Sequence, residues 1–187
     1  MMKVTLFIAF AALSSPAVAQ DWLAAAPSPQ LAVVAALKGG AEAFANAPND
    51  LQRGAARPAR AAAICKAIKN RRADKWIGKL KTLSTNSDGW GVLVVSVTPQ
   101  ASVGTMPNSM ADIKDKTLIN PKSPVYAAAS KLKEGDIVQF SGVFSKGDAD
   151  CIGEKSLTMT GAMMRPEFVL RFSAISKHEP VPAKPAT

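Results

Sequence analysis

The pattern of the sequence changes near residue 70, and this change is what most constrains the fold. Residues 21–70 are rich in alanine and almost free of β-branched side chains after Val34, a composition that favours helices. From there to about residue 175, short apolar or alternating stretches of strand length are separated by turn residues. The sequence therefore predicts an N-terminal helical segment, residues 20–70, followed by a β-rich domain, residues 71–175.

Two helices are expected in the first region. Ser28 followed by Pro29 predicts a helix start, with Ser28 as the capping residue and the proline at the first helical position. A second helix should begin between Asn46 and Asn49, be interrupted by Pro58, and resume from about Ala59 to Ile68. The first helix is expected to bury one apolar face formed by Leu31, Val34, Leu37, Ala41 and Phe44.

Five short strands are expected in the second region, with a short helix before the fourth. The helix should follow the capping pair Ser123-Pro124. Six segments are candidates for these five strands: residues 76–83, 90–97, 101–106, 137–144, 156–160 and 168–175. This order matches the five-stranded Greek-key barrel known as the OB-fold. The predicted class is α+β: a small five-stranded OB-like β-barrel preceded by an N-terminal helical segment.

One stretch carries a resemblance to a known family. KLKEGDIVQFSGVF, residues 131–144, resembles the entry to the fourth strand of tRNA-anti-like OB-fold domains, where a Gly-Asp turn precedes an alternating strand. The wider pattern over about residues 45–175 is similar to uncharacterised exported bacterial proteins, in the motifs NDLQ, DKWIGKL, FSGVF, CIGEKSLT and PEFVLRF. The resemblance implies an OB-like fold and no particular reaction; as a fold class, OB barrels bind oligonucleotides, oligosaccharides or proteins.

The first nineteen residues have the three parts of an export signal. Lys3 supplies a positive start, residues 4–13 form a short apolar run, and Ala17-Val18-Ala19 is a cleavage motif. The run is shorter than the about 20 residues that a membrane-spanning helix needs. A buried N-terminal helix is the alternative interpretation. The expectation is a periplasmic or secreted protein without a transmembrane anchor.

The two cysteines, Cys65 and Cys151, allow one intramolecular bridge, and an oxidising compartment favours its formation. Closing a loop of this length would stabilise the fold by about 4–5 kcal/mol in the chain-entropy model. A reactive thiol is the alternative, but no CxxC motif supports it. We expect a structural disulfide.

The positive charge of the chain is concentrated in one segment. The formal net charge is +9, yet residues 51–81 alone hold ten lysines and arginines against the single Asp74. Such a surface suits a phosphate-bearing partner, although a face that merely keeps an alanine-rich helix soluble is the plain alternative. The predicted binding residues are Arg53, Arg57, Arg60, Arg71, Arg72, Lys75 and Lys79.

Two tryptophans could extend such a surface. Trp76 and Trp90 lie on the first two expected strands, and binding of single-stranded nucleic acid pairs a basic groove with stacking rings. Tryptophan is also a common core residue, and little nucleic acid is expected in the periplasm. Nucleic acid is therefore a possible but disfavoured partner.

Composition removes several kinds of chemistry. His178 is the only histidine and lies within the proline-containing tail, residues 176–187, which is expected to be disordered. Histidine-based zinc sites, cysteine-rich clusters, phosphate-binding loops and a nucleophile elbow are all missing from the sequence. The carboxylate pairs fall in loop or turn contexts: Asp112 with Asp115, Glu134 with Asp136, and Asp148 with Asp150. No catalytic residue, metal or cofactor is predicted.

The sequence thus predicts an exported, non-catalytic binding module of the bacterial cell envelope, whose partner is an anionic envelope component or protein. Two alternatives remain open: an oligonucleotide-binding OB-fold protein, and a hydrolase of envelope polymers whose site is assembled from dispersed residues. The oligomeric state is not predicted.

Overall fold

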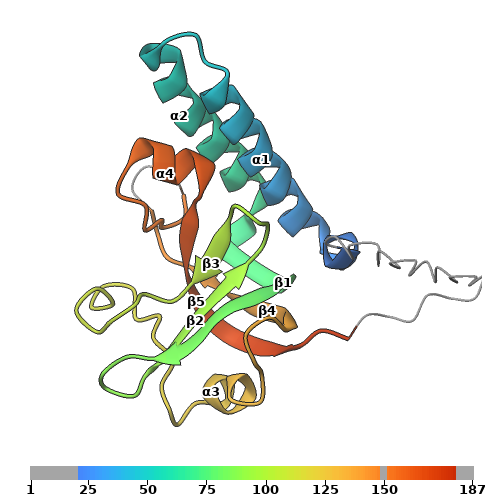
Figure 1. The fold of residues 1–187 in the computed structure, drawn as a ribbon, viewed down its shortest axis with the longest axis vertical. Helices are drawn as coiled ribbons and strands as arrows, with labels where there is room; N and C mark the ends of the chain where they lie inside the picture. Colours follow the sequence, from blue (N-terminus) through green and yellow to red (C-terminus); the bar gives the residue numbers. More distant parts are fainter. Residues whose placement is uncertain (1–20, 148–150, 180–187) are drawn as a thin grey trace, which may run out of the picture.

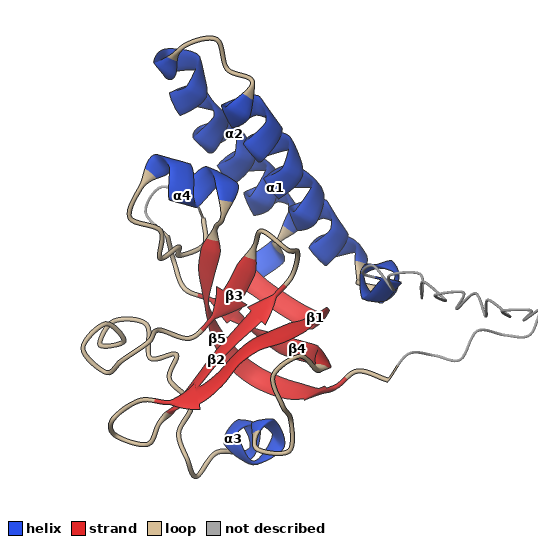
Figure 2. Cartoon of the chain, in the orientation of Figure 1, coloured by secondary structure: helices blue, strands red, loops and turns tan. Residues whose placement is uncertain are grey.

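The structure, a computed structural model, describes residues 21–147 and 151–179 (Figures 1 and 2). The signal segment predicted at residues 1–19 lies outside the described residues, as do Asp148, Asp150 and residues 180–187 of the predicted tail. In chain order the elements are η1 (Asp21–Ala25), α1 (Ser28–Ala45), α2 (Asp50–Ala67), η2 (Lys69–Arg71), β1 (Arg72–Thr85), β2 (Gly91–Ser96), β3 (Ser102–Gly104), α3 (Pro124–Ala129), β4 (Ile137–Phe144), α4 (Met159–Met164) and β5 (Glu167–Lys177).

The five strands close into a barrel in the order β1-β2-β3-β5-β4, with β4 returning to β1. All neighbours are antiparallel except β3 and β5, which run parallel. Closure pairs each of these strands on both sides, which explains why a barrel this small is stable without further strands. The α+β class with an OB-like barrel behind an N-terminal helical segment is confirmed.

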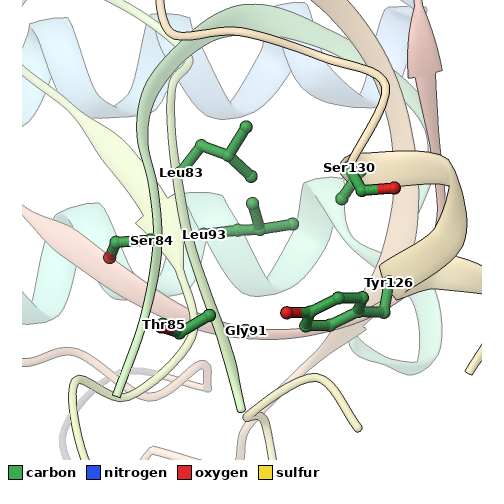
Figure 3. A pocket seen from close by; sticks show the side chains of 8 residues that line it. Leu83, Ser84, Thr85, Gly91, Leu93, Tyr126 and Ser130 are labelled. Carbon is green, nitrogen blue, oxygen red and sulfur yellow. The ribbon is translucent and has the colours of Figure 1, made fainter. Parts of the chain in front are cut away.

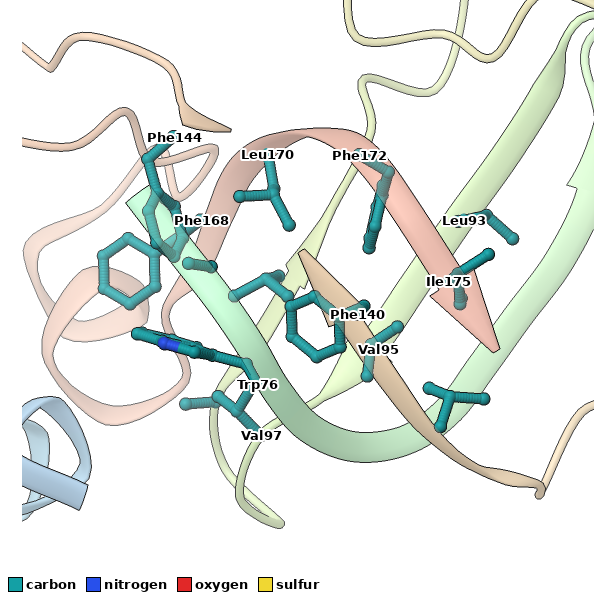
Figure 4. Close-up of a cluster of buried hydrophobic side chains, with 14 of the residues drawn as sticks. Trp76, Leu93, Val95, Val97, Phe140, Phe144, Phe168, Leu170, Phe172 and Ile175 are labelled. Carbon is teal, nitrogen blue, oxygen red and sulfur yellow. The ribbon is translucent and has the colours of Figure 1, made fainter. Parts of the chain in front are cut away.

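The barrel interior is apolar and built on the strand period of two. Strand β4 alternates strictly: Val138, Phe140, Gly142 and Phe144 are buried, and the residues between them are half-buried. Figure 4 shows rings and branched side chains from several strands meeting in this core. The ring of Trp76 lies edge-on to Phe144 at 5.4 Å and to Phe140 at 6.4 Å between ring centres.

Strand β4 needs a glycine where it bends. The pairing of β4 with β5 shifts register between Ser141 and Gly142. A side chain at Gly142 would place its Cβ 2.5 Å from the carbonyl oxygen of Arg171 on β5. The small residue therefore allows the close approach that the bulge requires.

The two long helices form a hairpin that leaves the barrel on one side, while α3 packs at the other end (Figure 1). Helix α2 starts with the side chain of Asn49 accepting a hydrogen bond from the amide of Gln52, within the range predicted for its start. The predicted break at Pro58 is wrong, because α2 continues through this residue. A proline costs one backbone hydrogen bond, and here the packing of α1 on α2 keeps the helix continuous.

Two expectations for α1 need correction. Pro27 precedes the helix without a side-chain cap, so Ser28 lies inside the first turn rather than capping it. The buried face is also rotated from the expected one, and consists of Gln30, Val33, Leu37, Gly40 and Phe44. Gln30 is buried because its amide exchanges two hydrogen bonds with the backbone of Ile77 on β1. A polar residue thus anchors α1 to the barrel, which apolar periodicity could not indicate.

The segment between β4 and β5 differs from the prediction. Residues 156–160 form no strand; Thr158 instead caps α4 by accepting a hydrogen bond from the amide of Gly161. At the other end, β5 continues to Lys177, two residues into the predicted tail. The capping pair Ser123-Pro124 is confirmed, since the Ser123 hydroxyl accepts from the amide of Tyr126.

Candidate anion-binding groove

The three arginines predicted on α2 face different surroundings. Arg53 pairs with Asp50 at 2.9 Å and lies 5.6 Å from the centre of the Phe44 ring. Arg57 is one-quarter exposed and lies 3.7 Å from the carboxylate of Glu154. Arg60 is fully buried. The three arginines lie on adjacent turns of α2, as their spacing predicts, but they do not form one exposed surface.

Arg60 belongs to a polar contact between α2 and the segment that joins β4 to β5. Its guanidinium donates to the carbonyl oxygen of Ala162 at 2.5 Å and lies 3.4 Å from Glu154, whose side chain is only 4% exposed. Gly40 of α1 makes room for it, because a Cβ there would come within 2.9 Å of the Arg60 side chain. We call this contact, together with the disulfide nearby, the α2 junction: Arg57, Arg60, Cys65, Cys151, Glu154 and Ala162.

The predicted disulfide is confirmed. Cys65 of α2 and Cys151 are bonded across 86 residues of sequence, with their Cα atoms 5.7 Å apart, within the normal range for a bridge. Covalent and ionic links therefore fasten the same segment to the same helix.

The basic residues of η2 and β1 are divided as well. Arg71 donates to the carbonyl oxygen of Phe144 at 3.0 Å, and Arg72 is exposed beside Val143 in the strand register. Lys75 lies at a bulge where its amide donates to the Ser141 hydroxyl, and Lys79 is exposed further along the strand. Only the first two lie at the end of β1 that reaches the groove described next.

Two adjoining hollows, of about 280 and 240 Å³, form a groove between the start of β1, the end of β4, β5 and the loop that follows β3. Both are lined by Lys114, Asp115 and Lys146. We call this the basic groove, after its five cationic side chains: Arg57, Arg71, Lys114, Lys146 and Arg171. These residues come from five separate segments of the chain, so their convergence is a property of the fold.

The charge of the basic groove is strongly unbalanced. Its carboxylates are Asp115 and Glu154, and Glu154 lies against Arg57 and Arg60. Arg72 and Arg171 flank Val143 on neighbouring strands, which extends the positive surface over the outside of the barrel. A concave surface of one sign concentrates counter-ions, and here it would attract anions.

Backbone strain occurs at the entry to β1, where Arg71 reaches the groove, and at two other basic residues. Among the described residues, four that are not glycine have positive φ angles, and three of these are basic: Arg71 (54°), Lys75 (52°) and Lys116 (49°). Asn70 (52°) directly precedes Arg71, so two left-handed residues in succession turn the chain from α2 into β1. Strain of this kind is concentrated at functional sites, because the surrounding fold must hold it in place.

Sequence reasoning missed Lys114, Lys146 and Arg171. Each lies outside the basic segment 51–81, and the sequence around it contains no comparable cluster of basic residues. They lie near Arg71 only because of the order of the strands in the barrel. The two predicted stacking residues separate: Trp76 is 2% exposed and belongs to the core, whereas Trp90 is 37% exposed at the rim of the β1–β2 hairpin. Only Trp90 is accessible to a partner.

Among the carboxylates paired in the sequence, Asp112 and Glu134 have structural partners. The Asp112 carboxylate accepts from the amides of Thr117 and Leu118, and Glu134 accepts from the amide of Leu83. Lys155 donates to the carbonyl oxygen of Thr105 and pairs with Glu167. No cluster of three metal-ligating residues occurs within residues 21–147 and 151–179.

The pKa of Asp136 lies below its ordinary value. The main cause is the hydrogen bond that its carboxylate accepts from the backbone amide of Lys133, and the ammonium of Lys177 at 3.2 Å adds to it; partial burial acts in the opposite direction. This carboxylate joins the start of β4 to the end of β5. It lies away from the basic groove.

A third hollow, of about 260 Å³, lies between the β1–β2 hairpin and α3 and is lined by Leu83, Leu93, Tyr126 and hydroxyl-bearing residues (Figure 3). It has no charged side chain, so it does not suit an anion as the basic groove does.

In the part of the chain that the structure describes, no helix is both long and apolar enough to cross a membrane. Comparison of the chain with protein-family models, with curated proteins and with solved structures finds no match.

Proposed function

We propose that this chain is an exported, non-catalytic binding module of the bacterial cell envelope, and that the basic groove holds an anionic ligand or partner. The observation that carries the proposal is the convergence of five cationic side chains from separate segments on two adjoining hollows. The N-terminal signal pattern and the disulfide both fit an oxidising compartment outside the cytoplasm.

The charged groups of the groove suit binding better than reaction. A hydrolase of envelope polymers would need two converging carboxylates or an activated nucleophile. The groove contains Asp115 and a Glu154 that lies against two arginines, while its remaining charged groups are cationic. Cationic side chains around a hollow hold phosphate or carboxylate groups by charge-assisted hydrogen bonds.

Binding of a labelled soluble polyanion such as heparin, measured by fluorescence anisotropy over a range of salt concentrations, tests the proposal. The variant Lys114→Gln/Arg171→Gln removes two charges from the groove and should weaken binding at least about tenfold, because each contact is worth about 1 kcal/mol. Affinity of the wild type should also fall steeply as salt rises.

Lys79→Gln/Lys81→Gln is the matched control, because it removes the same charge from exposed positions further along β1. This control should lose much less affinity than the groove variant. Equal losses in both would mean that net charge alone attracts the polyanion, and the absence of binding at low salt would overturn the proposal.

A further inference from the structure

The loop that joins β3 to α3, residues 105–123, presents apolar side chains to solvent beside the basic groove. Met110 is 83% exposed and Ile113 is 73% exposed, and they lie in the same loop as the groove residue Lys114. Trp90, on the neighbouring hairpin, lines a hollow together with Ser109 and Lys116 of this loop. Figure 1 shows the loop standing out from the barrel next to the β1–β2 hairpin.

Hydrogen bonds within the loop fix the backbone that carries Met110 and Ile113. The buried carboxylate of Asp112 accepts three hydrogen bonds, from the amides of Thr117 and Leu118 and from the Thr117 hydroxyl. The same hydroxyl accepts from the amide of Met106, which closes the loop on itself. The hydrogen-bonded loop therefore keeps Met110 and Ile113 exposed to solvent, although contact between apolar side chains and water is unfavourable.

The hairpin and the loop are also joined to each other. The Ser109 hydroxyl donates to the carboxylate of Asp88 at 2.6 Å, and the side-chain amide of Asn86 donates to Ser109 at 3.0 Å. Trp90 follows in the same turn, where its amide donates to Asn86. One rigid unit thus presents an indole and two aliphatic side chains.

Two lysines follow these apolar side chains in the loop. Lys114 and Lys116 flank Asp115 in the loop, and the hairpin contributes Asp88, which is engaged by Ser109. Beyond Lys114, the groove continues with Lys146, Arg71 and Arg171. Exposed apolar side chains next to lysines and a cationic groove, with a tryptophan nearby, are typical of surfaces that bind an anionic bilayer.

We propose that the anionic partner is a lipid bilayer surface: the β3–α3 loop inserts Met110 and Ile113 between acyl chains while the basic groove lies over lipid phosphates. This inference rests on the proposed function and specifies its partner. Aliphatic side chains gain nothing from a polyanion chain in water, whereas a bilayer surface offers phosphate and hydrocarbon within a few ångströms. Trp90 alone would serve a nucleic acid by stacking; Met110 and Ile113 would not.

Sedimentation with large unilamellar vesicles tests the inference, using phosphatidylcholine alone and phosphatidylcholine mixed with phosphatidylglycerol. The wild type should bind the anionic vesicles and not the neutral ones. Met110→Ser/Ile113→Ser should bind anionic vesicles at least about tenfold more weakly, because the two apolar side chains that insert into the bilayer are lost. Its affinity for soluble heparin should stay within about twofold of the wild type, because the groove keeps its charges.

Leu51→Ser is the matched control, since Leu51 is 89% exposed at the start of α2, remote from the loop. It should bind vesicles like the wild type. All variants carry the same N-terminus, so any contribution of residues 1–19 to vesicle binding is common to them. Circular dichroism and thermal unfolding show whether each variant is folded; substitutions at such exposed positions should leave both unchanged.

Three results would overturn the inference and leave the proposed function standing. They are heparin binding without vesicle binding, equal binding to neutral and anionic vesicles, and vesicle binding that Met110→Ser/Ile113→Ser does not weaken. A single-stranded oligonucleotide could displace the protein from vesicles and bind the wild type and Met110→Ser/Ile113→Ser equally well. That result would assign the groove to nucleic acid instead. Absence of binding to both heparin and vesicles would overturn the proposed function as well.

Discussion

The barrel interior and the α2 junction hold the molecule together by different means. The interior is formed by apolar residues that alternate along each strand, such as Val138, Phe140 and Phe144 of β4. The α2 junction is held by an arginine, a glutamate and a disulfide, all joining segments about ninety residues apart. Apolar packing is tolerant of exchange among residues of similar volume, whereas a buried ion pair fails when one partner is removed.

The difference has a consequence for the basic groove. Arg57, Glu154 and Gly153 line it and belong to the α2 junction or its immediate neighbourhood, while Arg71, Val143 and Arg171 belong to the barrel wall. The groove therefore forms where the two parts meet. Loosening the junction should disturb the groove before it disturbs the barrel.

Removal of the disulfide should have the largest effect on stability. Cys65→Ala/Cys151→Ala should lower the free energy of unfolding by about 4–5 kcal/mol, chiefly because the unfolded chain gains the freedom of a long loop. Urea denaturation followed by circular dichroism measures the loss. Comparison with wild-type protein treated with reductant separates the missing bond from the two altered side chains.

If the barrel holds by its own core, the reduced and variant proteins should keep the wild-type far-ultraviolet spectrum at low urea while heparin binding weakens. A spectrum without strand content would instead show that the barrel depends on the α2 junction for its folding. That outcome would mean that the barrel interior and the α2 junction do not contribute to folding independently.

Loss of the buried cation should come next in size. Arg60→Met should cost about 3 kcal/mol, because the buried carboxylate of Glu154 loses the nearer of the two arginines that lie against it. The double variant Arg60→Met/Glu154→Met should recover most of this loss, since both charges are then replaced by apolar groups. Thermal and urea unfolding of the two variants provide the comparison.

Arg53→Met is the matched control on the same helix. Arg53 is partly exposed and pairs with Asp50 over the Phe44 ring, so this change should cost less than about 1 kcal/mol. If the double variant at the junction were as unstable as Arg60→Met alone, the hydrogen bond to Ala162 rather than the ion pair would be the main link.

The same contrast separates what the sequence could predict from what it could not. The barrel strands followed from alternation and turn residues, because a closed sheet must bury one face of every strand. The disulfide followed from the presence of two cysteines and from the oxidising compartment that the signal segment predicts. Pro58 was misjudged because local propensity says nothing about the support that α1 gives to α2.

Polar contacts over long sequence distances carried no local signal. Nothing around Arg60 distinguishes it from Arg53 or Arg57, yet Arg60 is buried and Arg53 is not. Gln30 was equally unmarked, although it pairs with the backbone of β1. The basic groove escaped prediction for the same reason: its cations are neighbours only because β1, β4 and β5 adjoin in the barrel.

The smallest effect should come from a polar contact at the surface of the barrel, remote from the α2 junction. The carboxylate of Asp136 accepts a hydrogen bond from the amide of Lys133 and pairs with Lys177, and its pKa in the folded protein is lowered. A depressed carboxyl pKa stabilises the folded state above the unfolded value, about 3.9, and this contribution is lost as the pH falls through the folded pKa. Asp136→Asn should therefore be less stable than the wild type at pH 7, and the difference should vanish at pH values low enough to protonate the wild-type carboxyl. Urea midpoints across this pH range measure the difference in stability.

Lys177→Gln should reproduce only part of the effect, because the backbone amide of Lys133 is the larger cause of the shift in the pKa of Asp136. A stability difference that persists unchanged in acid would show that the side chain acts through its shape or its neutral hydrogen bonds, and that the rim of the barrel, like its interior, is held without charge.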